Sequence, residues 1–441
     1  MGLAKPSKRL RRLQIFTSAL CVVLVAINYI DRGTVAIANL HIRQEFGLTG
    51  TTIGALISAW SLAYALSQLP GGFLVDRLGS RWILTISTFV WSLAQAAGGI
   101  AGSFAQLAFS RSVLGFGEAP ALLSAARVTR NWYPPAERGL PTGAYIGATV
   151  LGPVIGPPIL TALMLSFGWR AMFIAMGIVG IVAAAIWYLV YRDIENHDLP
   201  QNDLAYARGD DTKAVTHLRF RQWLGLFRFR TVWGLPLGAF GLGYMFWIYF
   251  GWLPAILEMR YHVSIAQTGY LASLPWFGGI AGAACCGYIS DWWAQRGYSP
   301  LLCRKVPTVL GLCCMAVFVA LMSQAESVAW ALICGTFVVF SGIVSTTGLW
   351  ALVTVLAPEE YTGSMASIPN CGAYLGATCS PIITGFLLDK TGSFAPGLLV
   401  GAAVGIICAG FWIVMVREPI QSDAIDSADV LIGGPPQSRA V

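Results

Sequence analysis

The order of apolar and polar residues along the chain predicts a bundle of membrane-spanning helices. Apolar runs of about 18 residues or more recur from end to end, and each is long enough to cross a hydrocarbon layer of about 30 Å. Twelve such runs form two groups of six on either side of a polar stretch at 193–230. The predicted spans are 14–38, 52–74, 82–103, 105–130, 139–165, 170–192, 231–257, 266–290, 304–323, 327–356, 362–387 and 395–416.

The two groups of spans divide the chain into five parts. We expect a cytoplasmic N-terminal tail over 1–13, a six-helix bundle over 14–192, a cytoplasmic linker over 193–230, a second six-helix bundle over 231–416 and a cytoplasmic C-terminal tail over 417–441. The predicted fold class is therefore an all-α integral membrane protein of twelve transmembrane helices in two pseudo-symmetric six-helix bundles.

Repeated stretches indicate that the two bundles are related by duplication. The sequence GAYIGAT at 143–149 returns as GAYLGAT at 372–378, in each case at the start of the fifth helix of its half. The stretch GGFLVDRLGSRW at 71–82 has a degenerate counterpart, CGYISDWWAQRG, at 286–297. Two related bundles joined by a linker are typical of transporters that bind substrate between the halves and expose it to each side in turn.

Composition and charge agree with a membrane location. The chain is 56% hydrophobic and 11% charged, with a mean hydropathy of +0.66, which leaves too little polar surface for a water-soluble protein of 441 residues. Only four of the 28 Lys and Arg residues fall in predicted outer loops, namely Arg43, Arg170, Arg260 and Lys390. The positive-inside rule then places both termini on the cytoplasmic side of the cell inner (plasma) membrane. The net charge of +7 reflects this topology, so the bilayer is the expected partner and nucleic acid is not.

Candidate chemistry of other kinds is not apparent. The ten Cys residues lie almost entirely inside apolar spans, and the four His residues lie in loops, without metal-ligand spacing between them. We find neither a phosphate-binding glycine loop after a strand nor a Ser, His and Asp set at one membrane depth. The sequence therefore predicts no enzyme, no metal and no cofactor other than protons as the coupling ion, and we expect a monomer.

The loop after the second span carries a recognisable signature. The stretch GGFLVDRLGSR at 71–81 resembles the loop 2–3 motif of the major facilitator superfamily, and the resemblance covers essentially the whole chain. Its glycines would let helices 2 and 11 approach closely. Asp76, Arg77 and Arg81, with Asp291 at the equivalent place in the second half, would form a charge network that holds the cytoplasmic side shut.

Three further stretches resemble the anion:cation symporter family within that superfamily. They are NYIDR at 28–32, RSVLGFGEA at 111–119 and NWYPPAERG at 131–139. The family contains carriers of hexuronates, aldonates and aldarates, as well as some carriers of aromatic acids. The resemblance implies proton-coupled uptake of a small organic anion by alternating access, with a sugar acid as the expected substrate and an aromatic carboxylate as the alternative.

The same resemblance implies roles for three charged residues. Asp31 and Glu118 would take the protons, and Arg32 would meet the substrate carboxylate. The physics of the bilayer points to these residues too, because a charge near its centre costs about 2.5–3.5 kcal/mol and normally faces a cavity or a partner. Neighbouring helix residues point about 100° apart, so one partner for both Asp31 and Arg32 is awkward.

Arg111 belongs to the structural charge network that we expect around these residues. It precedes Glu118 by seven residues, two helical turns, and so shares its helix face. A purely structural Arg111–Glu118 pair stays open as an alternative, as does a role for Asp31 as the partner of a helix-4 arginine only. A permanently charged, planar guanidinium such as that of Arg32 suits two-point capture of a carboxylate.

The remaining candidate ligands are uncharged, and the resemblance implies them. Tyr29 and Tyr64 would line the substrate site from helices 1 and 2, and Trp350 and Asn370 from helices 10 and 11. This division predicts that the first half binds the carboxylate and the second half binds hydroxyl groups. Aromatic residues at helical spacing are also common packing residues, so packing remains the alternative for each of them.

Protons are needed because of the membrane potential. A potential of about 100 mV, negative inside, opposes the entry of a monoanion by about 2.3 kcal/mol, and two accompanying protons reverse the sign of the moving charge.

One stretch favours a different direction of transport. GPVIGPP at 152–158 partly matches the Gly-Pro-rich motif of drug/proton antiporters, which keeps antiport open as an alternative.

Overall fold

The computed structural model describes residues 6–208, 224–357 and 362–420, and nearly all of them lie in helices. Two short 3-10 helices, η1 (Pro135–Glu137) and η2 (Ile194–Asn196), precede α7 and α8. The α-helices are α1 (Lys8–Asp31), α2 (Thr34–Ile37), α3 (Asn39–Phe46), α4 (Gly50–Gly99), α5 (Phe104–Glu118), α6 (Pro120–Trp132), α7 (Gly139–Val190), α8 (Gln201–Arg208), α10 (Arg230–Tyr261), α11 (Ile265–Gln295), α12 (Pro300–Ser323), α13 (Val328–Leu356), α14 (Thr362–Thr391) and α15 (Ala395–Met415).

Two of these helices each cross the bundle twice. In α4 and α7 the chain turns back at Gly79 (φ 80°) and Gly168 (φ 82°), backbone conformations that favour glycine. Eight helical stretches of the described residues are long and apolar enough to span a membrane, and one of them is α7. Four more crossings come from the second part of α7, the two parts of α4, and α5 joined to α6. Together with the eight stretches they make up the twelve-helix bundle.

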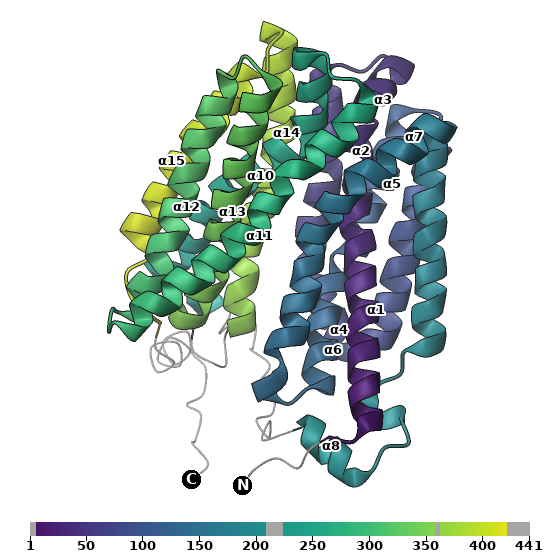
Figure 1. Cartoon of the computed structure of the whole chain (residues 1–441), viewed down its shortest axis with the longest axis vertical. Coiled ribbons are helices and arrows are strands. Elements are labelled where there is room, and N and C mark those ends of the chain that lie inside the picture. The colour runs from purple at the N-terminus through teal and green to yellow at the C-terminus, as the bar shows by residue number, and fades with distance from the viewer. Residues whose placement is uncertain (1–5, 209–223, 358–361, 421–441) are drawn as a thin grey trace.

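The twelve crossings form two groups (Figure 1). We call α1–α7 the N-half and α10–α15 the C-half. The end of the bundle at which α1 begins and α15 ends is the inner end, and the opposite end is the outer end. Helix α8, from the segment between the halves, lies at the inner end, and the two groups diverge toward that end (Figure 1).

Two helix boundaries differ from the predicted spans. The first helix begins at Lys8, six residues before the apolar run, because the Ser7 hydroxyl caps it by accepting a hydrogen bond from the Leu10 amide at 3.1 Å. The predicted fourth span is divided into α5 and α6 between Glu118 and Pro120. Proline supplies no amide hydrogen, so a new helix starts there readily.

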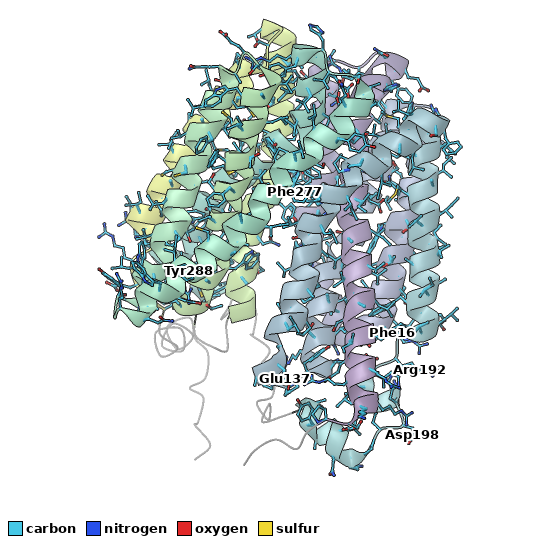
Figure 2. The ribbon with its side chains drawn as sticks, in the orientation of Figure 1. Phe16, Glu137, Arg192, Asp198, Phe277 and Tyr288 are labelled. Carbon is cyan, nitrogen blue, oxygen red and sulfur yellow. The ribbon has the colours of Figure 1, made fainter. Side chains whose placement is uncertain are left out.

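The outer surface of the bundle shows where lipid and water are expected. Phe16 on α1 and Phe277 and Tyr288 on α11 are 47%, 54% and 74% exposed, and such apolar surface suits a hydrocarbon environment (Figure 2). The labelled charged residues Glu137, Arg192 and Asp198 instead gather at the inner end of the N-half (Figure 2).

The NWYPPAERG stretch stabilises the inner end of the N-half. Glu137 of η1 accepts hydrogen bonds from the Arg11 guanidinium at 2.6 and 3.1 Å, and a further one from the Tyr206 hydroxyl of α8. The Arg11 hydrogen bonds hold the pKa of Glu137 below its usual value. This stretch therefore joins α1, η1 and α8, and its role here is structural.

The halves meet along α4 and α14 at the outer end. The Asp389 carboxylate of α14 accepts hydrogen bonds from the Gly50 and Thr51 amides, at 2.6 and 2.7 Å, where α4 begins. A Cβ atom added at Gly54 would lie 2.2 Å from the Pro381 carbonyl oxygen, so only glycine allows this approach. We call this contact, from Asp389 inward along α4 and α14, the outer seam.

Helices α7 and α11 form a second contact that is closed only toward the outer end. A Cβ atom at Gly269 of α11 would lie 2.4 Å from the Thr161 hydroxyl of α7. Toward the inner end, Cβ atoms built at Gly143 and Gly147 of α7 and at Gly287 of α11 would meet nothing within 4 Å. Among the described residues, the two halves are therefore joined at the outer end and apart at the inner end.

The outer seam gives a first prediction. We expect Asp389→Ala to speed amide hydrogen exchange in a peptide covering residues 47–54 by roughly 10- to 100-fold, because hydrogen bonds to a charged acceptor contribute about 1.5–3 kcal/mol. Hydrogen-exchange mass spectrometry measures this rate. The matched control is Glu326→Gln, on another outer loop, which leaves the rate unchanged. Equal exchange in both variants would show that Asp389 does not hold the seam.

Candidate functional site

A buried ion pair lies where the two halves come together. The Arg32 Nε donates to the Glu118 Oε2 at 2.9 Å, and the two side chains are 3% and 0% exposed. A second Arg32 nitrogen, Nη2, donates to the Asn28 Oδ1 at 2.8 Å. Removing one partner from such a pair costs about 3–5 kcal/mol, because the remaining charge is left buried alone.

Both charged partners lie at interruptions of their helices. Helix α1 ends at Asp31, Arg32 and Gly33 form a turn, and the Thr34 hydroxyl donates to the Asp31 carbonyl at 2.7 Å. Glu118 is the last residue of α5. Because both helices are interrupted here, the two charged side chains lie inside the bundle next to a helix end.

Aromatic rings surround the Arg32 guanidinium. Its central carbon lies 3.9 Å from the ring centroid of Tyr29, 4.7 Å from that of Trp60 and 4.9 Å from that of Tyr64. The Trp60 indole also donates to Glu118 Oε2 at 3.1 Å, so it touches both members of the ion pair. Cation–π contacts of this kind stabilise a desolvated cation and keep water away from it.

The C-half completes this cluster with two aromatic residues. The Arg32 Nη1 donates to the Tyr374 hydroxyl at 3.3 Å, and the Tyr374 ring lies 4.3 Å from that of Tyr64. Trp247 of α10 packs against Trp60 with ring centroids 4.7 Å apart. We call Arg32 and Glu118, with Tyr29, Trp60, Tyr64, Trp247 and Tyr374, the arginine cluster. It contains residues of both halves, so a movement of one half changes its geometry.

Asp31 and Arg111 lie beside the arginine cluster with different surroundings. Asp31 is fully buried, and neither of its carboxylate oxygens accepts a hydrogen bond from a described residue. Arg111 donates from Nη1 to the Thr34 hydroxyl and to the Gln95 side-chain oxygen, each at 3.3 Å. The hydrogen bonds of Glu118 go to Arg32 and Trp60, which argues against Arg111 as its direct structural partner.

The structure brings some of the candidate ligands together and leaves others apart. Tyr29 and Tyr64 contact Arg32 as described, whereas Trp350 is 44% exposed and makes no ring contact with the arginine cluster. Trp350 lies two turns after Ile343, whose face of α13 meets Gly279 of α11. A Cβ atom at Gly279 would also lie 3.7 Å from Val150 of α7, so this face of α13 lies near the N-half, and the role of Trp350 as a ligand stays a prediction.

Asn370 occupies a position from which it can reach a substrate. It is partly buried on α14, one helical turn before Tyr374 and hence on the same face, toward the inner end. A molecule that approaches Arg32 from the inner end would pass Asn370 first. Nothing in the contacts of the described residues gives Asn370 another role.

The loop charges do not join the halves in this conformation. Arg81 donates to the Tyr188 carbonyl at 2.9 Å within the N-half, and Asp291 pairs with Arg304 at 3.4 Å within the C-half. Arg77 is exposed, and the side chain of Asp76 lies outside the described residues. The predicted network that holds the inner end shut is thus not formed among the described residues, since the halves stand apart there.

The close contact predicted between helices 2 and 11, which are the first crossing of α4 and α14, lies elsewhere along these helices. A Cβ atom at Gly71 would approach Pro120 and Leu123 of α6, at 3.5 and 3.9 Å, rather than α14. The close approach of α4 to α14 occurs instead at Gly50 and Gly54, near the outer end. The loop-motif glycine therefore packs within its own half.

Sequence reasoning offered Trp247 only as one of several neutral residues of the C-half, and it missed Trp60 and Tyr374 altogether. Trp60 was hidden among 16 Trp residues in an apolar protein, and no pattern distinguishes it from a packing residue. Tyr374 lies inside the repeated GAYLGAT stretch, which points to duplication and not to a ligand. A signal for Tyr374 was its position one turn after Asn370.

Comparisons with known proteins were consistent with this architecture. The profile described as Major Facilitator Superfamily matches residues 21–378. The chain is similar to a probable L-galactonate transporter of Escherichia coli (strain K12), with 38% identity over 96% of this chain and 94% of that protein. It is also similar to a probable galactarate/D-glucarate transporter of Bacillus subtilis (strain 168), with 31% identity over 94% of each.

A solved structure shares the fold at low sequence identity. It is a bacterial homologue of the human lysosomal transporter Spinster, with a TM-score of 0.71 and 18% identity over 98% of this chain and 100% of that one. The likeness shows that the arrangement of helices described above is one that occurs in a crystal structure.

Proposed function

Because the chain belongs to the major facilitator superfamily and is a multi-pass membrane transporter rather than an enzyme, we propose that it takes up a sugar acid together with protons. The observation that carries the proposal is the buried Arg32–Glu118 pair at the inner limit of the outer seam. A guanidinium at that point binds a carboxylate in two-point fashion once its own carboxylate partner is neutralised. The printed names of the relatives, galactonate and galactarate/D-glucarate transporters, indicate the substrate class.

In this proposal Glu118 and the substrate compete for Arg32. The Arg32 Nε donates to Glu118 Oε2 in the structure, and we assign the ionised form of Glu118 to this state. A proton on Glu118 removes its charge, weakens that hydrogen bond and frees the guanidinium for the incoming carboxylate. Release of the substrate lets Glu118 ionise and pair with Arg32 again, which makes proton and anion binding interdependent.

Asp31 is the second proton carrier in this proposal. A fully buried carboxylate such as Asp31 is costly while ionised, even with Arg111 and the Trp91 indole nearby, and protonation removes that cost. Two protons with one monoanion move one net positive charge inward, which a negative interior favours by about 2.3 kcal/mol per 100 mV. Neither a metal nor an organic cofactor is part of this scheme.

The rival direction of transport has less support. The Gly-Pro stretch of α7 packs tightly on α1, since a Cβ atom at Gly152 would lie 2.6 Å from the Tyr29 Cβ. This packing accounts for the glycine without any antiport role. We place the inner end in the cytoplasm of a bacterial cell, because the basic residues gather at that end. In this proposal the protein lies in the inner membrane as a monomer.

Transport by purified protein tests the proposal. We expect proteoliposomes with an acidic outside medium to accumulate labelled L-galactonate or D-galactonate, and a protonophore to abolish the accumulation. Galactitol, which has the hydroxyl groups but no carboxylate, is expected to compete only at concentrations roughly 100-fold higher, because it forms no charge-assisted hydrogen bond with Arg32. Failure to accumulate any sugar acid from a panel of hexonates, hexuronates and hexarates would contradict the proposal, and accumulation of aromatic acids alone would replace the substrate class.

A further inference from the structure

Tyr374 stands out in the arginine cluster because it comes from the C-half. Two of the three side-chain hydrogen bonds of Arg32 go to residues of the N-half, Asn28 and Glu118. The third joins Arg32 Nη1 to the Tyr374 hydroxyl at 3.3 Å. In this bond Tyr374 must accept, because a guanidinium only donates.

The Tyr374 hydroxyl keeps its one hydrogen for an acceptor: the neighbouring Tyr64 takes it here, and a carboxylate beside Arg32 is the stronger acceptor. A hydroxyl has one hydrogen and two lone pairs, and the contact with Arg32 uses only a lone pair. The ring is held in place by Tyr64, with centroids 4.3 Å apart, and by Trp60 at 6.0 Å. An acceptor that arrives beside Arg32 thus finds a fixed hydroxyl next to the guanidinium.

The backbone around Tyr374 is fixed to the rest of the C-half. A Cβ atom at Gly372 would lie 2.2 Å from the Pro236 carbonyl oxygen, and one at Gly376 would lie 2.1 Å from the Phe240 carbonyl oxygen. At both glycines α14 packs directly against α10, so the Tyr374 hydroxyl moves only when the C-half moves. One turn further outward, Thr378 belongs to the outer seam, where its carbonyl accepts from Ser58 at 2.6 Å.

We propose that Tyr374 is a substrate ligand supplied by the C-half, whose oxygen accepts from Arg32 while its O–H donates to the substrate carboxylate. The inference rests on the proposed function, since it requires an anion at Arg32. The carboxylate is then held by one residue of each half. Because Tyr374 moves with the C-half, separation of the halves at the outer seam withdraws one ligand from the carboxylate and couples substrate affinity to conformation.

The substitution Tyr374→Phe tests this ligand while it keeps the ring contacts. We expect the affinity for D-galactonate or L-galactonate, measured by isothermal titration calorimetry on purified protein, to fall by roughly 10- to 100-fold, the range for a hydrogen bond to a charged group. Binding of galactitol, which has no carboxylate, is expected to be equal in the variant and the wild type. A loss that depends on the carboxylate distinguishes a ligand from a residue that only supports the fold.

The repeat supplies a matched control. Tyr145 occupies the same position of the GAYIGAT stretch in the N-half and is 6% exposed, and the contacts of Arg32 with described residues do not include Tyr145. Tyr145→Phe is therefore the same chemical change at the equivalent repeat position, and it is expected to leave galactonate affinity within about twofold.

The outcomes separate this inference from the proposed function. If Tyr374→Phe binds galactonate as tightly as the wild type, or if it loses galactonate and galactitol binding equally, Tyr374 is not a carboxylate ligand, although uptake by the wild type still stands. If the wild type binds and accumulates no sugar acid, the proposed function itself fails. Melting temperatures of both Phe variants close to that of the wild type would show that the fold is retained.

Discussion

Arg32→Lys is expected to weaken the binding of a hexonate by roughly 100-fold, and Arg32→Ala to abolish detectable binding. A lysine ammonium is a compact charge that cannot present two parallel N–H donors to one carboxylate, and each charge-assisted bond contributes about 1.5–3 kcal/mol. The lysine side chain is also shorter, so its charge lies farther from Asn28 and Tyr374, which bind the guanidinium in the wild type. Isothermal titration calorimetry on the purified variants measures the loss.

Stability must be measured alongside binding in these variants. Arg32→Ala leaves Glu118 without its cation in a fully buried position, which costs about 3–5 kcal/mol unless the carboxyl group takes up a proton. Arg32→Lys keeps the positive charge and is the more informative variant. Arg43→Lys, on the outer side of the N-half, is the matched control and is expected to bind like the wild type. Near-normal binding by Arg32→Lys would contradict two-point capture of the carboxylate.

The cost of burying charge made the centre of this site predictable from sequence. Asp31, Arg32 and Glu118 are ionisable groups in apolar runs, and such groups need a partner or a cavity. The structure supplies the partner for two of them, since Arg32 pairs with Glu118 at 2.9 Å. The rule identifies which residues matter, but it does not say which pairs form, because that depends on how two helices are rotated toward each other.

Uncharged residues were harder to place for the same reason. Trp60 and Tyr374 carry no energetic penalty in an apolar span, so nothing in their sequence context marks them as members of the arginine cluster. Trp350 shows the same limit, since its helix was predicted correctly while its side chain is 44% exposed in this conformation. Periodicity fixes which residues share a face, and only tertiary packing fixes where that face points.

The fold was predictable because hydrocarbon thickness sets the length of each apolar run. The twelve crossings and the duplication followed from those runs and from the repeated GAYIGAT and GAYLGAT stretches. The conformation was not predictable in this way. The loop charges Arg81 and Asp291 are bonded within their own halves here, and a single sequence must serve every state of a carrier that alternates.

Proton coupling is the property that separates Glu118 from a structural partner of Arg32. We expect Glu118→Gln to bind galactonate with an affinity that depends less on pH and to lose the proton that Glu118 carries, which leaves Asp31 as the remaining proton carrier. Glutamine has nearly the shape of the protonated acid and still accepts from Arg32 and Trp60, whose donors now reach Glu118 at 2.9 and 3.1 Å. It has no proton to release.

Two transport measurements on the same proteoliposomes check this expectation. In the wild type, each coupled proton multiplies the accumulation of substrate by about tenfold per pH unit of gradient, since one unit corresponds to about 1.4 kcal/mol. In Glu118→Gln the accumulation per pH unit is expected to fall by about tenfold, the share of one proton, while exchange of labelled for unlabelled galactonate continues, because exchange needs no net proton movement.

Two further variants sharpen the test. Asp31→Asn is expected to lower the dependence on the pH gradient as well, since Asp31 is the second carboxylate buried beside the arginine cluster. Glu258→Gln changes a partly buried carboxylate of α10 that makes no contact with that cluster, and it is expected to accumulate substrate like the wild type. If the accumulation of galactonate by Glu118→Gln depends on the pH gradient as steeply as in the wild type, Glu118 serves only to hold Arg32, and its coupling proton must travel on another group.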